Sequence, residues 1–155
     1  MRREDERPDL AAMLAPVLRS LVAVESPVIA AHDISMWGYS VLSALDDNPI
    51  RTQAALAEAI GADKSRIIGT LDELQAAGLI SREPDPDDRR VRLLSITEQG
   101  RRVKNAIKAE IQAAEERLLA DLSAADRRGF LRALRTLSEL TSEEIVERAR
   151  EQQGH

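Results

Sequence analysis

Cationic and hydroxyl side chains cluster where one helix is expected to begin. Lys64, Ser65 and Arg66 follow Asp63 directly, and Thr70 lies about one turn later. An arginine can donate two hydrogen bonds to guanine O6 and N7, whereas lysine and serine more commonly contact phosphate. These residue types at the start of a helix predict contacts to duplex DNA. The alternative is that they are solvent-exposed polar residues on an outer helix face.

A second cationic pair, Arg89 and Arg90, ends a turn-rich stretch of prolines and aspartates. A narrow minor groove attracts arginine side chains. Asp88 would be repelled by phosphate if it pointed outward, so we expect it to fold back and hold Arg90 by a charge-assisted hydrogen bond. The alternative is an exposed, charge-balanced turn.

Thr52 and Gln53 begin another expected helix, whose free N–H groups and amide side chain suit a phosphate. Helix capping alone explains Thr52 equally well. The later cations Arg101, Arg102 and Lys104 are interpreted as a solvated helix face, not as a DNA contact.

Most of the aromatic character of the chain lies near residues 32–39. His32, Met36, Trp37 and Tyr39 could line a pocket for a small aromatic or anionic effector, with His32 or an arginine meeting its negative group. The alternative is a core tryptophan beside a surface tyrosine and histidine. His32 has no partner cluster, so no metal site is predicted.

Composition excludes several classes of protein. The 155 residues suit a single domain, and a chain without cysteine cannot form disulfides or thiolate sites. No phosphate-binding glycine loop or nucleophile elbow is visible, so we expect no enzyme, no catalytic residue and no cofactor. No apolar run of about 20 residues is apparent, which predicts a cytoplasmic protein without membrane contact. The net charge of −5 requires that any basic surface be local.

The elements that must position these residues follow from apolar spacing and capping signals. Leu56 and Ile60 predict a short helix ending at Gly61, and Ile67, Leu71 and Leu74 predict a second one capped by Asp63. Strands are expected at 79–83 and 91–96, joined by a long tip. Before this unit we expect a helix from Asp9, with Pro16 kinking or splitting it and Ser26-Pro27 bending or breaking it, and then a helix capped by Ser35.

A long helix should start at Thr97, followed by one capped by Ser123 and a further turn or two after Thr141. These terminal helices cannot bury their apolar stripes alone, so we expect them to pack together and against a second copy of the chain. A twofold dimer would also place two recognition helices about one DNA turn apart, as a palindromic site requires.

The order of elements resembles the MarR family of bacterial transcription regulators. The resemblance lies in Trp37…Val41-Leu42-x-x-Leu45, Gln53-x-x-Leu56-Ala57-x-x-Ile60-Gly61-x-Asp63-Lys64-Ser65, Leu71-Asp72-x-Leu74-x-x-x-Gly78-Leu79-Ile80 and Asp88-Arg89-Arg90-x-x-x-Leu94-x-Ile96-Thr97-x-x-Gly100. It implies a mainly α fold with a small β-hairpin wing (α+β), that is, a winged helix-turn-helix with N- and C-terminal dimerisation helices. Residues 1–155 would form one domain, with the DNA-binding part at 35–97 and dimerisation helices at 8–34 and 98–148.

The implied function is a DNA-binding regulator, typically a homodimeric repressor released by a small aromatic ligand. This sequence departs from the family pattern at Ile68 and Gly69, where relatives often carry a polar residue and an arginine, and at Glu73, where a basic residue is frequent. The alternative function is a helical protein-interaction module whose winged helix does not read DNA.

Overall fold

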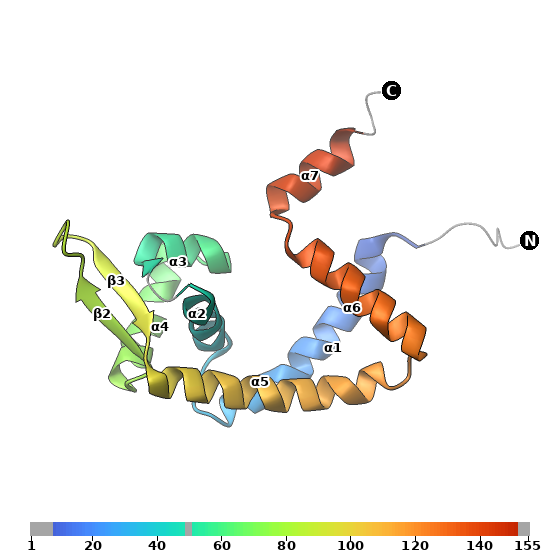
Figure 1. Ribbon diagram of the computed structural model, residues 1–155, viewed down its shortest axis with the longest axis horizontal. Coiled ribbons are helices and arrows are strands. Elements are labelled where there is room, and N and C mark those ends of the chain that lie inside the picture. Colours follow the sequence, from blue (N-terminus) through green and yellow to red (C-terminus); the bar gives the residue numbers. More distant parts are fainter. Residues whose placement is uncertain (1–7, 49–50, 152–155) are drawn as a thin grey trace, which may run out of the picture. The chain divides into compact units, whose positions relative to one another are not determined.

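A computed structural model describes residues 8–48 and 51–151, which form seven helices and one three-stranded sheet (Figure 1). The elements in chain order are α1 (Leu10–Ala30), α2 (Met36–Asp47), β1 (Arg51–Thr52), α3 (Gln53–Ile60), α4 (Lys64–Ala76), β2 (Ile80–Pro84), β3 (Arg92–Ile96), α5 (Glu98–Leu119), α6 (Ala124–Ser138) and α7 (Ser142–Glu151). The predicted fold class, mainly helical with a small β-hairpin wing, is confirmed. The chain divides into two compact units, 1–114 and 115–155.

The first unit contains the winged helix-turn-helix. Its core is almost wholly aliphatic, as the scarcity of aromatic residues requires, and it joins α2, α3, α4, the sheet and the first part of α5. The expected inward residues of α4, Ile67, Leu71 and Leu74, are all buried. Ser35, Thr52 and Asp63 cap α2, α3 and α4 as predicted, and Gly61 ends α3 with a φ of +66°. Side chains other than glycine rarely adopt that conformation.

The sheet has the strand order β1-β3-β2, and both pairings are antiparallel. The expected hairpin is present, with Ile80 opposite Ile96 and Arg82 opposite Leu94. The short strand β1, which pairs Thr52 with Leu93, was not predicted. A two-residue strand carries too little alternation to be recognised in a sequence.

The start of α5 is tied to the turn between α4 and β2. Thr97 donates its hydroxyl to the Gly78 carbonyl at 2.7 Å and accepts from the Gly100 N–H at 3.0 Å. A Cβ atom at Gly100 would lie 2.0 Å from the Leu79 carbonyl oxygen, so only glycine allows this close approach. The wing is therefore held at its base by α5.

Helix α1 runs without interruption through Pro16 and Pro27, which excludes a split at Pro16 and a break before Val28; the alternatives, a kink at Pro16 and a bend at Pro27, stay predictions. A proline removes one backbone hydrogen bond but has a φ that suits a helix, and the rest of the ladder continues. Ser20 and Ser26 add side-chain hydrogen bonds to the carbonyls of Pro16 and Val22, at 3.0 and 2.7 Å. Among the described residues α1 is also the one helix whose length and apolar composition would allow it to cross a membrane, which the sequence analysis did not anticipate.

The second unit consists of the end of α5 with α6 and α7. Ser123 caps α6 by accepting from the Asp126 N–H at 3.1 Å, and Arg127 contacts Glu116 at 2.7 Å. Thr141 and Glu144 form a reciprocal capping box at the start of α7. Helix α6 has no buried residue, although it carries four large apolar side chains on its surface: Phe130, Leu131, Leu134 and Leu137.

Candidate nucleic-acid interface

Helix α4 begins with a tightly organised cap. The Asp63 carboxylate accepts from the Ser65 N–H at 2.9 Å and from the Ser65 hydroxyl at 2.6 Å. The Ser65 hydroxyl, followed by the Ser65 N–H, lowers the pKa of Asp63 below its usual value. In this arrangement the Ser65 hydroxyl would have to leave Asp63 before it could donate to a phosphate.

The two cations beside Ser65 have accessible side chains, although the backbone N–H and the charge of Arg66 also help to lower the pKa of Asp63. Lys64 and Arg66 are exposed, and neither side chain forms an ion pair with the part of the chain that the structure describes. Thr70, in contrast, is half-buried and lines a cavity of about 40 Å³ between α2 and α4, together with Gly38 and Leu74. The start of α4 therefore offers two available cations, while Thr70 faces the body of the unit.

An arginine that the sequence analysis missed fixes the wing against α4. Arg82 on β2 donates to Gln75 at 2.6 Å and forms an ion pair with Asp72, and both partners lie on α4. The Arg82 side chain is only 19% exposed. In the sequence, Arg82 is visible merely as a cation within a short expected strand. Its partners Gln75 and Asp72 lie seven and ten residues away, and no rule for helices or hairpins predicts contacts at that spacing. This bridge sets the wing relative to the recognition helix.

The wing tip is closed by its own aspartates. Asp85 accepts from the Asp87 N–H at 2.8 Å, and Asp88 accepts from both the backbone N–H and the Nε of Arg90, at 3.1 and 3.2 Å. The contact expected between Asp88 and Arg90 is thus present, yet the Arg90 side chain remains 92% exposed. Arg89 is also exposed. Two acidic residues shape the tip while both arginines stay accessible.

Helix α3 starts where β1 ends. Thr52 is half-buried, pairs with Leu93 in the sheet and caps α3 through its hydroxyl, which accepts from the Ala55 N–H at 3.2 Å. Gln53, the first residue of α3, is also half-buried. Capping and strand pairing therefore account for Thr52 in the free protein, and its predicted phosphate contact stays a prediction.

The interpretation of Lys104 as part of a solvated face is wrong, whereas Arg101 is exposed as expected. Lys104 is buried, with 8% exposure, and its ammonium group pairs with Asp46 at the end of α2. Arg101 Nε donates to the same carboxylate at 2.8 Å, whereas Arg102 pairs with Glu98 on its own helix and with no other acid in residues 8–48 and 51–151. The hydrogen bond from Lys104 and then that from Arg101 lower the pKa of Asp46. The cluster joins α2 to α5 and lies outside the group of DNA-contact candidates.

The residues proposed for an effector pocket differ in their contacts and exposure, and the pocket stays a prediction. His32 Nε2 lies 2.9 Å from Glu110 Oε1 of α5, Met36 and Tyr39 pack against the core, and Trp37 is exposed on α2. The hollows described at the wing, between α2 and α4, and on α7 are lined by other residues.

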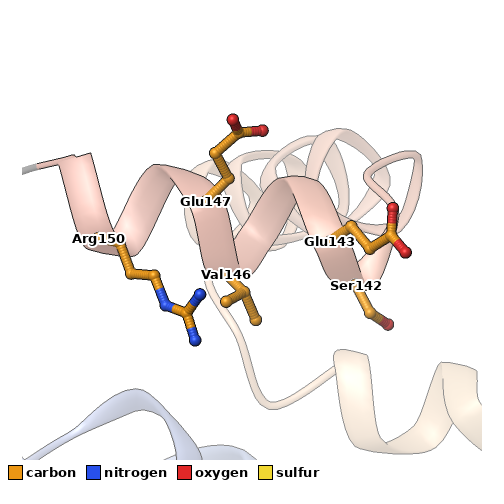
Figure 2. Close-up of a pocket in the computed structure, with 5 residues that line it drawn as sticks. All are labelled: Ser142, Glu143, Val146, Glu147 and Arg150. Carbon is orange, nitrogen blue, oxygen red and sulfur yellow. The ribbon is translucent and has the colours of Figure 1, made fainter.

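The largest of these hollows lies along α7. Figure 2 shows its lining residues, Ser142, Glu143, Val146, Glu147 and Arg150, all from this one helix. Because the described lining residues all come from one exposed helix, we assign no ligand to this surface.

Comparisons with known proteins agree with this geometry. A model of the MarR family matches residues 32–91. A Thauera aromatica protein named as a transcriptional regulator for the hcr operon is 32% identical over 105 residues, which cover 68% of this chain and 63% of that protein. The transcriptional regulator HosA of Escherichia coli O111:H- is 30% identical over 105 residues, covering 68% of this chain and 78% of HosA.

CouR is among the solved proteins that are similar to this chain in both sequence and structure. The transcriptional repressor CouR, bound to a 23-mer DNA duplex, is 28% identical, with a TM-score of 0.72 over 84% of this chain and 92% of CouR. CouR from Rhodococcus jostii RHA1 bound to p-coumaroyl-CoA has a TM-score of 0.69 at 28% identity, over 86% of this chain and 94% of CouR.

Proposed function

The chain belongs to the MarR family of transcriptional regulators, and from this membership we propose that it is a homodimeric repressor of a palindromic operator. Membership also places it among DNA-binding proteins and not among enzymes, in agreement with the sequence analysis. We further propose that it acts in the cytoplasm, because its task requires access to the chromosome.

The proposal depends on one observation: the winged helix-turn-helix carries two accessible groups of cations, one at the start of α4 and one at the wing tip. Lys64 and Arg66 stand exposed at the start of α4, and Arg89 and Arg90 stand exposed at the wing tip. Arg82 ties the wing to α4, so the two sites keep a fixed relation. A helix in the major groove and a cationic hairpin at the neighbouring minor groove require this arrangement.

The dimer is supported by the apolar surface of the terminal helices. Leu10, Leu14 and Leu18 on α1 are exposed, and Leu18 reaches 61%. Helix α6 presents a further row of exposed leucines. A soluble chain gains by covering such surfaces with a second copy, and a twofold pair reads a palindrome.

Repression and release by an effector rest on likeness alone. CouR, which is named a repressor, has been solved with DNA and, in another structure, with p-coumaroyl-CoA. For this chain we propose an aromatic or anionic effector near His32, Met36, Trp37 and Tyr39. Thermal unfolding with and without a panel of aromatic acids and their CoA thioesters would reveal such a ligand as a rise in Tm.

The direct test is selection of bound duplexes from a random pool, followed by titration of variants on the selected site. Arg66→Ala should cost about 1–3 kcal/mol and relax base choice at one position per half-site. Arg90→Ala should weaken all sequences by a similar factor and reduce the salt dependence, because a phosphate or minor-groove cation carries little base information. Unchanged binding in both variants would remove the site assignment.

Arg102→Ala is the matched control, because Arg102 is an exposed arginine whose ion pair among the described residues is with Glu98 on its own helix. It should bind like the unmodified protein. Salt separates the proposal from its alternative: binding through a few cations weakens steeply as ionic strength rises, whereas docking of a protein on an apolar surface does not. A pool that yields no enriched duplex at low salt would favour the protein-interaction module.

A further inference from the structure

Two neighbouring positions on α4 break the usual rules for an exposed helix. Ile68 is a β-branched apolar residue with 46% of its surface exposed. Gly69 follows it in mid-helix, where glycine is unfavourable relative to alanine. A single exposed isoleucine would mean little, since scattered apolar residues are normal on surfaces. Two adjacent exceptions on the proposed DNA-contacting helix call for a common cause.

The folded chain itself gives Gly69 no reason to be glycine. Its φ lies outside the left-handed region, and a Cβ atom added there would meet nothing within 4 Å. Gly61 and Gly78 need their positive φ, while Gly38 and Gly100 are closely packed by neighbours. Gly61 and Gly129 are the other described glycines with nothing within 4 Å of an added Cβ; the positive φ of Gly61 accounts for that residue, and Gly129 lies on the proposed dimer helix α6. The open side of Gly69 therefore indicates close approach by something outside the chain.

The position of Ile68 on α4 indicates which group of a bound DNA would lie against it. Residues four apart are neighbours on a helix surface, so Ile68 lies one turn beyond Lys64 and one turn before Asp72. Lys64 is an accessible cation, and Asp72 holds Arg82 of the wing. Ile68 thus lies on the strip of α4 between a cation and the wing anchor, where a base edge would lie if α4 occupies the major groove.

We propose that Ile68 recognises the 5-methyl group of a thymine in each operator half-site, and that Gly69 lets the groove come close enough for this contact. The thymine methyl is the one apolar group among the base edges of the major groove, and apolar side chains contact it. The side chain of isoleucine cannot hydrogen-bond to any base, so it can distinguish one base from another only through contact with this methyl group. The inference rests on the proposed DNA binding and deepens it by naming a specificity-determining residue.

The test uses the full-length protein and the duplex that it selects. Each thymine is replaced in turn by deoxyuridine, which removes only the methyl group. Replacement of one particular thymine in each half-site should lower the affinity about fourfold, which is the effect expected for losing the burial of one methyl group. With Ile68→Ala the same replacement should have no effect, while Ile68→Val and Arg66→Ala should retain it. Ile68 is exposed, so these variants should fold, and circular dichroism checks that they do.

Each outcome decides a different question. A selected duplex with no uracil-sensitive thymine, or a full uracil effect retained in Ile68→Ala, overturns the role of Ile68 and leaves the proposed function standing. Failure to select any duplex overturns the proposed function itself. Gly69→Ala adds an independent arm: it should weaken binding to the selected duplex without lowering thermal stability, since its methyl group meets no protein atom. Unimpaired binding by that variant would remove the proposed close approach.

Discussion

The winged helix-turn-helix, α2 to β3, is called the head below. The head and the terminal helices carry similar aliphatic residues, but the head buries them and the terminal helices expose many of them. In the head, Leu42, Leu45, Leu56, Leu71 and Leu94 are fully buried. On α6, Leu131, Leu134 and Leu137 lie exposed, and no residue of that helix is buried. The core around the winged helix-turn-helix is complete within one chain, with Ile29 of α1 and Ile107 and Ile111 of α5 among its members, whereas α6 buries none of its residues.

This contrast shows which part of the chain buries its apolar side chains without a second molecule. Both α4 and α6 carry apolar residues at helical spacing, yet α4 buries Ile67, Leu71 and Leu74 while no residue of α6 is buried. Exposed apolar stripes of this extent are typical of surfaces that another molecule covers.

Truncating a head leucine should have the largest effect on stability. Leu71→Ala should lower the free energy of unfolding by about 2–5 kcal/mol, because it removes packed methyl groups and leaves a cavity. Urea denaturation at several protein concentrations measures this. The loss should be the same at every concentration, because the core lies within one chain. A loss below about 1 kcal/mol would mean that the head is less tightly packed than described.

Breaking the ion cluster between α2 and α5 should have an intermediate effect. Asp46→Asn leaves the buried Lys104 ammonium without its counter-charge and should cost on the order of 2 kcal/mol, less than for a fully buried pair because Asp46 retains some exposure. Lys104→Met, which removes the charge but keeps the stem, is the matched control and should be milder.

The same cluster predicts a pH dependence. The pKa of Asp46 is lowered in the folded protein from its usual value of 3.8, so its contribution to stability is complete above that value. It is lost as the pH falls through the lower, folded-state pKa. Urea midpoints below pH 4 should therefore fall more steeply in the unmodified protein than in Asp46→Asn. Parallel curves would contradict this assignment.

Changing an α6 leucine should have the smallest effect on the head and a distinct one on assembly. Leu134→Gln should raise the dimer dissociation constant at least about tenfold, because an amide enters an apolar contact twice by symmetry. Sedimentation over a range of concentrations measures it, with Leu134→Met as control. A protein that is monomeric and folded at micromolar concentration before any substitution would remove the proposed dimer.

Local features of the sequence were sufficient to predict much of the head. Ser35, Thr52 and Asp63 were recognisable as caps because a cap depends on one side chain and the next three residues. Gly61 was recognisable as a helix end for the same reason, and the buried face of α4 followed from its spacing. The contact between Asp88 and Arg90 spans two residues and was equally within reach.

Tertiary structure decided what depends on residues far apart in the chain. The attachment of Arg82 to α4, the burial of Lys104 on Asp46 and the pairing of β1 with β3 join segments that no local rule connects. The continuity of α1 through two prolines was likewise beyond local signals, which count the lost hydrogen bond but not the remaining ladder. Capping and apolar periodicity depend on residues within one or two helical turns, so they can be recognised from the sequence alone. Ion pairs and strand order become known only when the chain has brought their members together.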